Sequence, residues 1–90
     1  MKTHRLKTIN PYFDEVRQGV KNFEVRLNDR DLKVGDEVHL LEYDPKTSEY
    51  SGREVRVEIT YVLKNYEAIK PGYVVFGFII RQQTEELRSV

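Results

Sequence analysis

The sequence predicts an α+β domain in which about five strands form a small β-barrel, with one main helix after the first strand. Segments of alternating apolar and polar residues recur along the chain, as in half-buried strands. Only one segment, 10–20, carries its apolar residues at helical spacing. One helix cannot cover both faces of an open sheet, whereas a closed sheet buries its inner face and leaves few free edges.

The first two elements are a short strand and the helix. His4–Ile9 predicts the strand, with Leu6 pointing inward. The helix opens at Asn10 and Pro11, because Asn is a preferred cap and Pro is tolerated at the first helical position. Gly19 is placed to end it, since glycine accepts the left-handed conformation. The apolar residues at helical spacing, expected to be buried, are Phe13, Val16 and Val20.

A strand from Phe23 to Asn28 follows, with one face expected to be buried and the other charged. A turn at 34–36 leads into the next strand, Glu37–Tyr43, whose alternation slips near Leu40 and predicts a bulge or a bend there. The expected buried face of the first of these strands is Phe23, Val25 and Leu27, and the expected charged face is Glu24 and Arg26.

The second half of the chain predicts a hairpin loop and two more strands. The loop covers 44–52, and the strand after it buries alternate residues. Tyr73–Ile80 is apolar on both faces, which predicts a strand buried on both sides, with a bulge or a close backbone approach at Gly77. A frayed helix is expected over 82–90. The alternate residues expected in the core are Val55, Val57, Ile59, Tyr61 and Leu63.

Composition bounds the domain and its chemistry. Ninety residues make one domain, 1–90, with its core at about 4–80. Lys and Arg equal Asp and Glu at 15 each, which disfavours strong non-specific binding to nucleic acid, although 1–33 is locally basic. There is no cysteine, hence no disulfide, thiolate metal site or cysteine nucleophile. The two histidines, His4 and His39, are too few for a zinc site, and we expect both at the surface.

No cofactor and no membrane partner are expected. The chain has no glycine pattern of the kind that binds ATP, NAD or flavin. Its longest apolar run, Tyr73–Ile80, is far short of the roughly 20 residues that span a bilayer. No secretory signal pattern is visible at the N-terminus, so we expect a cytoplasmic protein. The oligomeric state stays open.

Residues Gly19–Arg26 read G-x-K-x-x-E-x-R. This segment resembles the signature of ASCH domains, which share the PUA-like β-barrel. The turn 33–36, the stretches 43–45 and 52–55 and the closing segment 72–78 are similar to a bacterial and phage branch of that superfamily, one without an assigned function. The resemblance covers about 4–80 and implies a PUA-like barrel.

The resemblance implies RNA binding in a cleft between the helix and the barrel. We therefore expect RNA or a nucleotide-like ligand between 11–19 and the strand that begins at Phe23. Lys21 and Arg26 would meet anionic or carbonyl oxygens, and Glu24 would accept hydrogen bonds from a base. The expected ligand-binding residues are Gly19, Lys21, Glu24, Arg26 and Arg30.

Two other functions remain open. Some ASCH members act on modified nucleosides, and a small hydrolase would use Lys21 and Glu24 as its catalytic proton-transfer pair, with water as the nucleophile. In the amidohydrolase-like members a threonine stands where this chain has Glu24, which weighs against that chemistry, and we lean away from an enzyme. The barrel could also serve as a scaffold for protein interaction. Lys21 and Glu24 would then form only a surface ion pair. If the ligand is RNA, Tyr50 and Tyr66 are the tyrosines expected in loops, where they could stack on bases.

Overall fold

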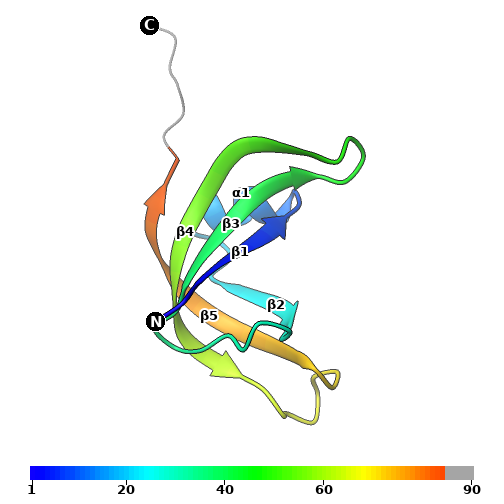
Figure 1. Ribbon diagram of the computed structural model, residues 1–90, viewed down its shortest axis with the longest axis vertical. Coiled ribbons are helices and arrows are strands. Elements are labelled where there is room, and N and C mark those ends of the chain that lie inside the picture. Colours follow the sequence, from blue (N-terminus) through cyan, green and yellow to red (C-terminus); the bar gives the residue numbers. More distant parts are fainter. Residues whose placement is uncertain (85–90) are drawn as a thin grey trace, which may run out of the picture.

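The computed structural model describes residues 1–84, which form a small half-barrel of five strands with a single short helix after the first strand (Figure 1). The sheet order is β1-β3-β4-β5-β2, so β1 and β2 are its edges. β1 pairs with β3 in parallel, and the other pairs are antiparallel. The elements are β1 (Thr3–Thr8), α1 (Tyr12–Arg17), β2 (Phe23–Leu27), β3 (Glu37–Asp44), β4 (Glu49–Leu63) and β5 (Tyr73–Gln83).

Bulges bend the sheet into this half-barrel. The register between β3 and β4 shifts between Leu41 and Tyr43, just beyond the irregularity predicted near Leu40. The register between β4 and β5 shifts again between Ile59 and Tyr61, opposite Gly77. Each extra residue increases the local bend and twist of a strand. The bulge expected at Gly77 is therefore carried by its partner strand.

The bulge in β4 also corrects two predicted core residues, Tyr61 and Leu63. Val55, Val57 and Ile59 are fully buried, as their alternation predicts. After the bulge the alternation is reversed, because one additional residue turns every later side chain to the other face. Tyr61 is consequently exposed instead of buried, Leu63 lies on the same outer face beside Val75, and Val62 packs against the core.

β2 is turned opposite to the prediction. Its apolar residues are half-exposed, at 44% for Phe23, 54% for Val25 and 52% for Leu27. Glu24 is buried and Arg26 is half-buried, because they face the same interior as Phe76 and Val74 of β5, their register partners. The expected buried face is thus the outer surface of the half-barrel, and the expected charged face lies inside it.

Two other strand predictions also change. β5 is buried on one face only, through Val74, Phe76 and Phe78, while Ile79 and Ile80 are exposed. β3 and β4 extend into the expected loop and leave only 45–48 between them. Of the frayed helix expected over 82–90, Gln82 and Gln83 belong to β5, and 85–90 lie outside the described residues.

α1 lies behind the sheet in the view of Figure 1. Phe13 and Val16 are fully buried, as predicted, but Val20 lies beyond the end of the helix and is 74% exposed. Gly19 follows that end with a φ of +77°, the left-handed conformation expected of it. Asn10 Oδ1 accepts a hydrogen bond from the Asp14 N–H at 3.0 Å and so supports the first helical turn.

Candidate functional site

The site begins at the gap between the two edge strands, β1 and β2, which we call the seam. Side chains bridge the seam. Arg26 Nη2 donates to the backbone carbonyl of Lys7 at 2.8 Å and to Thr8 Oγ1 at 3.2 Å. Further along, Arg30 Nη1 donates to the backbone carbonyl of Arg5 at 2.8 Å. Carbonyl groups on the free edge of β1 are therefore satisfied by two arginines.

Glu24 is the centre of an ion network at the inner side of the seam. One carboxylate oxygen, Oε1, accepts from Arg26 Nε at 3.1 Å and from Arg26 Nη2 at 3.0 Å. The other oxygen, Oε2, pairs with Lys21 Nζ. Lys21 also donates to the backbone carbonyl of Phe23 at 2.8 Å. Lys21 and Arg26 are thus both in direct contact with Glu24.

Burial explains why Glu24 needs both partners. Its side chain is 5% exposed, against 16% for Lys21 and 24% for Arg26. An ionised carboxylate at that depth is stable only when it is paired and hydrogen-bonded. Two cations on one carboxylate leave a net positive charge, which lies toward the solvent side of the network.

A cleft of 510 Å³ opens beside this network, and we call it the seam cleft. β1, the first turn of α1, the segment before β2 and β2 itself all contribute to its walls. Tyr12 is exposed there, and Lys21 Nζ lies 5.7 Å from the centre of the Tyr12 ring. The lining residues that carry polar or aromatic groups are Lys7, Thr8, Tyr12, Lys21, Glu24 and Arg26.

The structure brings together three of the five predicted binding residues, Lys21, Glu24 and Arg26. Gly19 is exposed and adopts the left-handed conformation after the end of the helix, and it does not line the seam cleft. Arg30 lies further along the seam, where it contacts β1.

Sequence reasoning missed Lys7, Thr8 and Tyr12. No local spacing relates Lys7 and Thr8 to the signature, because only the closing of the sheet brings β1 beside β2. Tyr12 is adjacent to Phe13 and four residues from Val16, so helical spacing places it next to the buried face and gave no signal for a position in a cleft.

Both histidines are buried, which corrects the expectation that they lie at the surface. His4 Nε2 lies 2.8 Å from Asp36 Oδ2. Burial raises the pKa of the Asp36 carboxyl, but hydrogen bonds from His4 and from the backbone N–H groups of Lys2 and Lys33 outweigh it and lower that pKa below its ordinary value. His39 is 8% exposed and pairs through Nε2 with Glu37 at 2.7 Å. His39 belongs to a strand between β1 and β4, where its register partners are Arg5 and Arg56.

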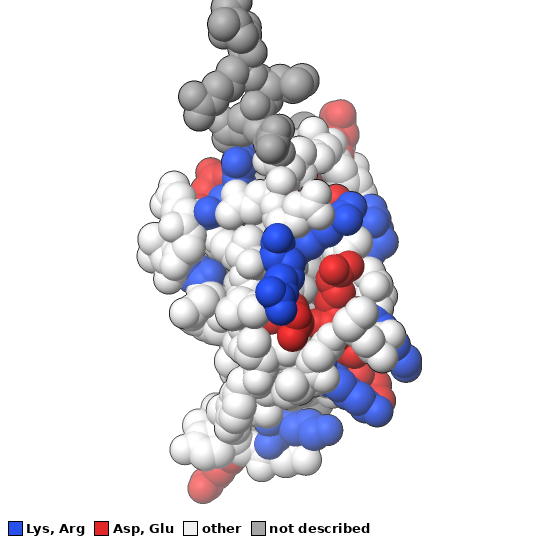
Figure 2. All heavy atoms as spheres, turned by 90° about the vertical axis from the view of Figure 1, so that its left-hand side faces the viewer, with Lys and Arg blue, Asp and Glu red and all other residues white. Residues whose placement is uncertain are grey.

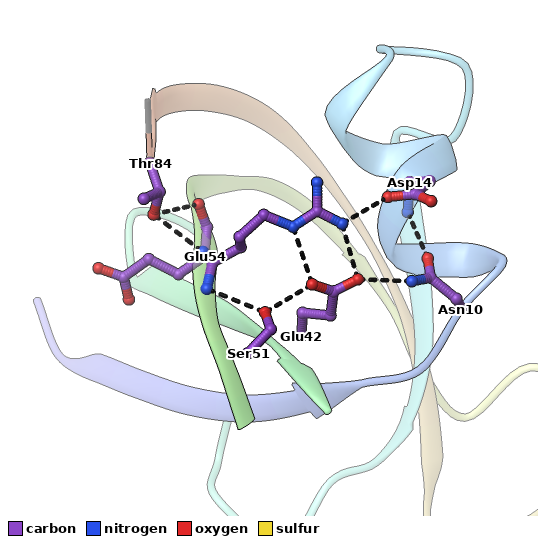
Figure 3. Close-up of polar contacts among 7 residues, drawn as sticks. Asn10, Asp14, Glu42, Ser51, Glu54 and Thr84 are labelled. Atoms are coloured by element: carbon purple, nitrogen blue, oxygen red, sulfur yellow. Dashed lines mark hydrogen bonds and ion pairs between the residues drawn. The ribbon is translucent and has the colours of Figure 1, made fainter. Parts of the chain in front are cut away.

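A second ion network joins α1 to the β3–β4 hairpin. Figure 3 shows Glu42 between Asn10 and Ser51, which both hydrogen-bond to its carboxylate. Arg53 donates to Glu42 at 2.7 and 2.8 Å and to Asp14 at 3.0 Å. The hydrogen bond from Arg53 is the largest influence on Glu42; it exceeds the opposing effect of burial and lowers the pKa of this carboxyl to about 2.

Elsewhere on the surface the charges are mixed. On the face shown in Figure 2, Lys and Arg side chains lie beside Asp and Glu side chains, and uncharged residues cover the rest. That face therefore shows no continuous field of one sign. Among residues 1–84, no group of three or more His, Cys, Asp or Glu side chains is placed to hold a metal ion. The same residues include no helix long and apolar enough to cross a membrane.

A family model described as a domain of unknown function, DUF3850, matches residues 3–78. The match spans every residue that lines the seam cleft. The chain belongs to the DUF3850 family. A search of curated proteins found no match.

In this DUF3850 domain the seam cleft combines three kinds of group in one place. Lys7, Lys21 and Arg26 supply positive charge, Glu24 supplies a fixed acceptor, and Tyr12 supplies an exposed aromatic ring. Such a set can hold an anionic group and a flat heterocycle at the same time.

Proposed function

We propose that this half-barrel is a PUA-like fold of the ASCH type, and that it binds RNA or a nucleotide-like ligand in the seam cleft. The observation that carries the proposal is the convergence of Lys7, Lys21 and Arg26 around one cleft beside the exposed ring of Tyr12. The chain as a whole has no net charge, so this local excess of cations is a feature of the cleft.

Each group in the cleft has a partner in a nucleotide. Lys and Arg side chains bind phosphate oxygens, and Nη1 of Arg26 lies outside the hydrogen bonds that the other two guanidinium nitrogens make to Glu24, Lys7 and Thr8. The ring of Tyr12 gives a stacking platform for a base. Glu24, held in place by its two cations, accepts a hydrogen bond from an amino or imino group of that base.

The Glu24 network favours binding over hydrolysis. Both oxygens of the Glu24 carboxylate are already engaged, Oε1 by Arg26 and Oε2 by Lys21. The Lys21 ammonium group is itself engaged by Glu24 and by the carbonyl of Phe23. A pair held in this way positions a ligand but is poorly suited to exchange a proton with it.

Thermal unfolding of the purified domain with and without a short RNA, a nucleotide or a modified nucleoside tests this proposal. A ligand at ten times its dissociation constant stabilises the domain by about 1.4 kcal/mol, or roughly 6–11 °C at this size. We expect such a shift in the wild type, and its loss in Lys21→Ala and Tyr12→Ala. The matched controls, Lys64→Ala and Tyr66→Ala, remove the same groups outside the seam cleft and should keep the shift.

A binding signal that survives both cleft variants would place the ligand elsewhere, and no shift with any nucleic-acid ligand would reject the proposal. Release of product from a modified nucleoside, with its loss in Lys21→Ala, would instead support the hydrolase.

One observation favours a second candidate function, protein interaction. The outer face of β2 continues across β5 and β4 without a charged residue. In the sheet register, Phe23 lies beside Gly77 and Tyr61, and Val25 beside Val75 and Leu63. Exposed apolar patches of this kind are typical of interfaces. The simplest partner for such a face is a second copy of it, related by a two-fold axis.

Sedimentation velocity over a range of concentrations tests this second candidate. We expect a concentration-dependent dimer in the wild type and a monomer in Val25→Glu, which adds a charge to the centre of the face. A wild-type monomer at all concentrations would contradict self-association through this face.

A further inference from the structure

A second cleft, of 310 Å³, lies along the same seam, and we call it the distal cleft. It shares Lys7 and Arg26 with the seam cleft. The hydrogen bond from Arg26 to the Lys7 carbonyl therefore crosses the boundary between two adjoining clefts. The distal cleft extends from that boundary to Arg30 and to Tyr50 of the β3–β4 hairpin.

The distal cleft is more basic than the seam cleft. Four cationic residues line it, with Asp29 as the one carboxylate among its lining residues. Across both clefts, five cationic residues stand against two carboxylates in a chain whose net charge is zero. The five are Arg5, Lys7, Lys21, Arg26 and Arg30.

Each cleft also has one exposed aromatic ring. Tyr12 is 49% exposed in the seam cleft, and Tyr50 is 51% exposed in the distal cleft. Tyr50 is held by its neighbour, because the rings of Tyr43 and Tyr50 lie 5.0 Å apart between centres. The seam thus carries a ring toward each end, and the cations Lys7 and Arg26 at the boundary between the two clefts.

We infer that the seam binds a single-stranded oligonucleotide, with one nucleotide in each cleft and the phosphate that joins them at the boundary marked by Lys7 and Arg26. The inference rests on the proposed function and defines its ligand further. Each tyrosine would stack on one base, which requires bases that are free of a duplex. A mononucleotide would occupy the seam cleft and leave the distal cations unused.

Fluorescence anisotropy tests the inference with four probes: uridine monophosphate as a competitor, single-stranded oligouridylates of two and of six nucleotides, and a blunt RNA duplex. For the wild type we expect the dinucleotide to bind at least about tenfold more tightly than the mononucleotide, because it adds a stacked base and a phosphate. The duplex should bind more weakly than the single strand of six nucleotides.

Two variants distinguish the contribution of the distal cleft to binding from that of the seam cleft. Arg30→Gln and Tyr50→Ala should remove most of the gain from one nucleotide to two, and leave competition by the mononucleotide unchanged. Arg81→Gln is the matched control for Arg30→Gln, since both arginines are exposed and each pairs with one carboxylate. Arg81 pairs with Glu58, and Arg30 pairs with Asp29. That control should bind every probe as the wild type does.

The outcomes distinguish the two levels of the proposal. Equal affinity for one, two and six nucleotides, with no effect of Arg30→Gln, would overturn the inference that a second nucleotide binds in the distal cleft. It would not contradict nucleotide binding in the seam cleft. Tight binding of the duplex would also overturn the inference. An absence of binding by any probe would overturn both.

Discussion

At the scale of single residues, Glu24 contributes both to the proposed site and to stability. Its carboxylate is buried beside Phe76 and is held by Lys21 and Arg26. A buried ion pair adds little net stability when complete, but the removal of one partner leaves a charge that nothing compensates. Substitution of Glu24 is therefore expected to destabilise the domain by more than the intact network stabilises it.

We predict that Glu24→Gln lowers the free energy of unfolding by roughly 2–3 kcal/mol, because two cations then face each other without a carboxylate between them. Urea unfolding at neutral pH measures this change. Adding Lys21→Gln should recover part of the loss, since one of the two cations is removed. Glu58→Gln, which disturbs only the exposed pair with Arg81, should cost less than about 1 kcal/mol. A Glu24→Gln variant as stable as the wild type would mean that the contacts of Glu24 with Lys21 and Arg26 do not stabilise the folded domain.

At the scale of elements, β2 shows how far the sequence alone can predict this structure. Alternation correctly placed a strand at 23–27, but alternation only divides a strand into two faces and does not say which one is buried. The apolar face of β2 is outside, because the charged face closes the seam with β1. That contact depends on the curvature of the whole sheet.

The same limit applies to Tyr61 and to the seam cleft. A single bulge reversed the side-chain alternation of β4 after Ile59, and the residue that indicated a bulge, Gly77, lies on the partner strand and not in β4 itself. Lys21, Glu24 and Arg26 were identified because they are close in sequence, within a segment, 19–26, that resembles a family signature. Lys7 and Thr8 were not, because their contact with Arg26 is formed across 18 or 19 residues of chain.

A pair of valines on neighbouring strands tests the orientation of β2. Val25→Ala should lower the free energy of unfolding by less than about 1 kcal/mol, since this side chain is on the outer face. Val74→Ala should lower it by about 2–3 kcal/mol, because Val74 is 1% exposed and its loss leaves a cavity. Chemical denaturation of both variants measures the two changes. The reverse order would show that β2 buries its apolar face.

At the scale of the whole molecule, the half-barrel divides its charges between two networks. The Glu24 network fastens β2 across the seam to β1, and the Glu42 network fastens α1 to β3 and β4. Both combine a carboxylate with an arginine that also reaches another element. The helix has only six residues, so its position depends on Phe13, Val16 and these polar contacts more than on its own stability.

The Glu42 network makes the stability of the domain depend on pH in the acid range. The pKa of Glu42 falls from 4.5 to about 2 on folding, so the folded domain favours the ionised carboxylate. This contribution is complete above pH 4.5, decreases as the pH falls toward 2, and is absent below that value. It corresponds to roughly 2–3 kcal/mol at neutral pH after allowance for solvent screening.

We therefore predict that Glu42→Gln lowers the free energy of unfolding at pH 7 by roughly 2–3 kcal/mol, and that the difference from the wild type narrows between pH 4.5 and pH 2. Urea unfolding at a series of pH values measures both curves. Glu49→Gln is the control, because this carboxylate is exposed in the same hairpin, and its curve should follow that of the wild type. A Glu42→Gln difference that stays constant down to pH 2 would mean that the loss comes from packing. In that case the ion pair with Arg53 would not be what holds α1 against the sheet.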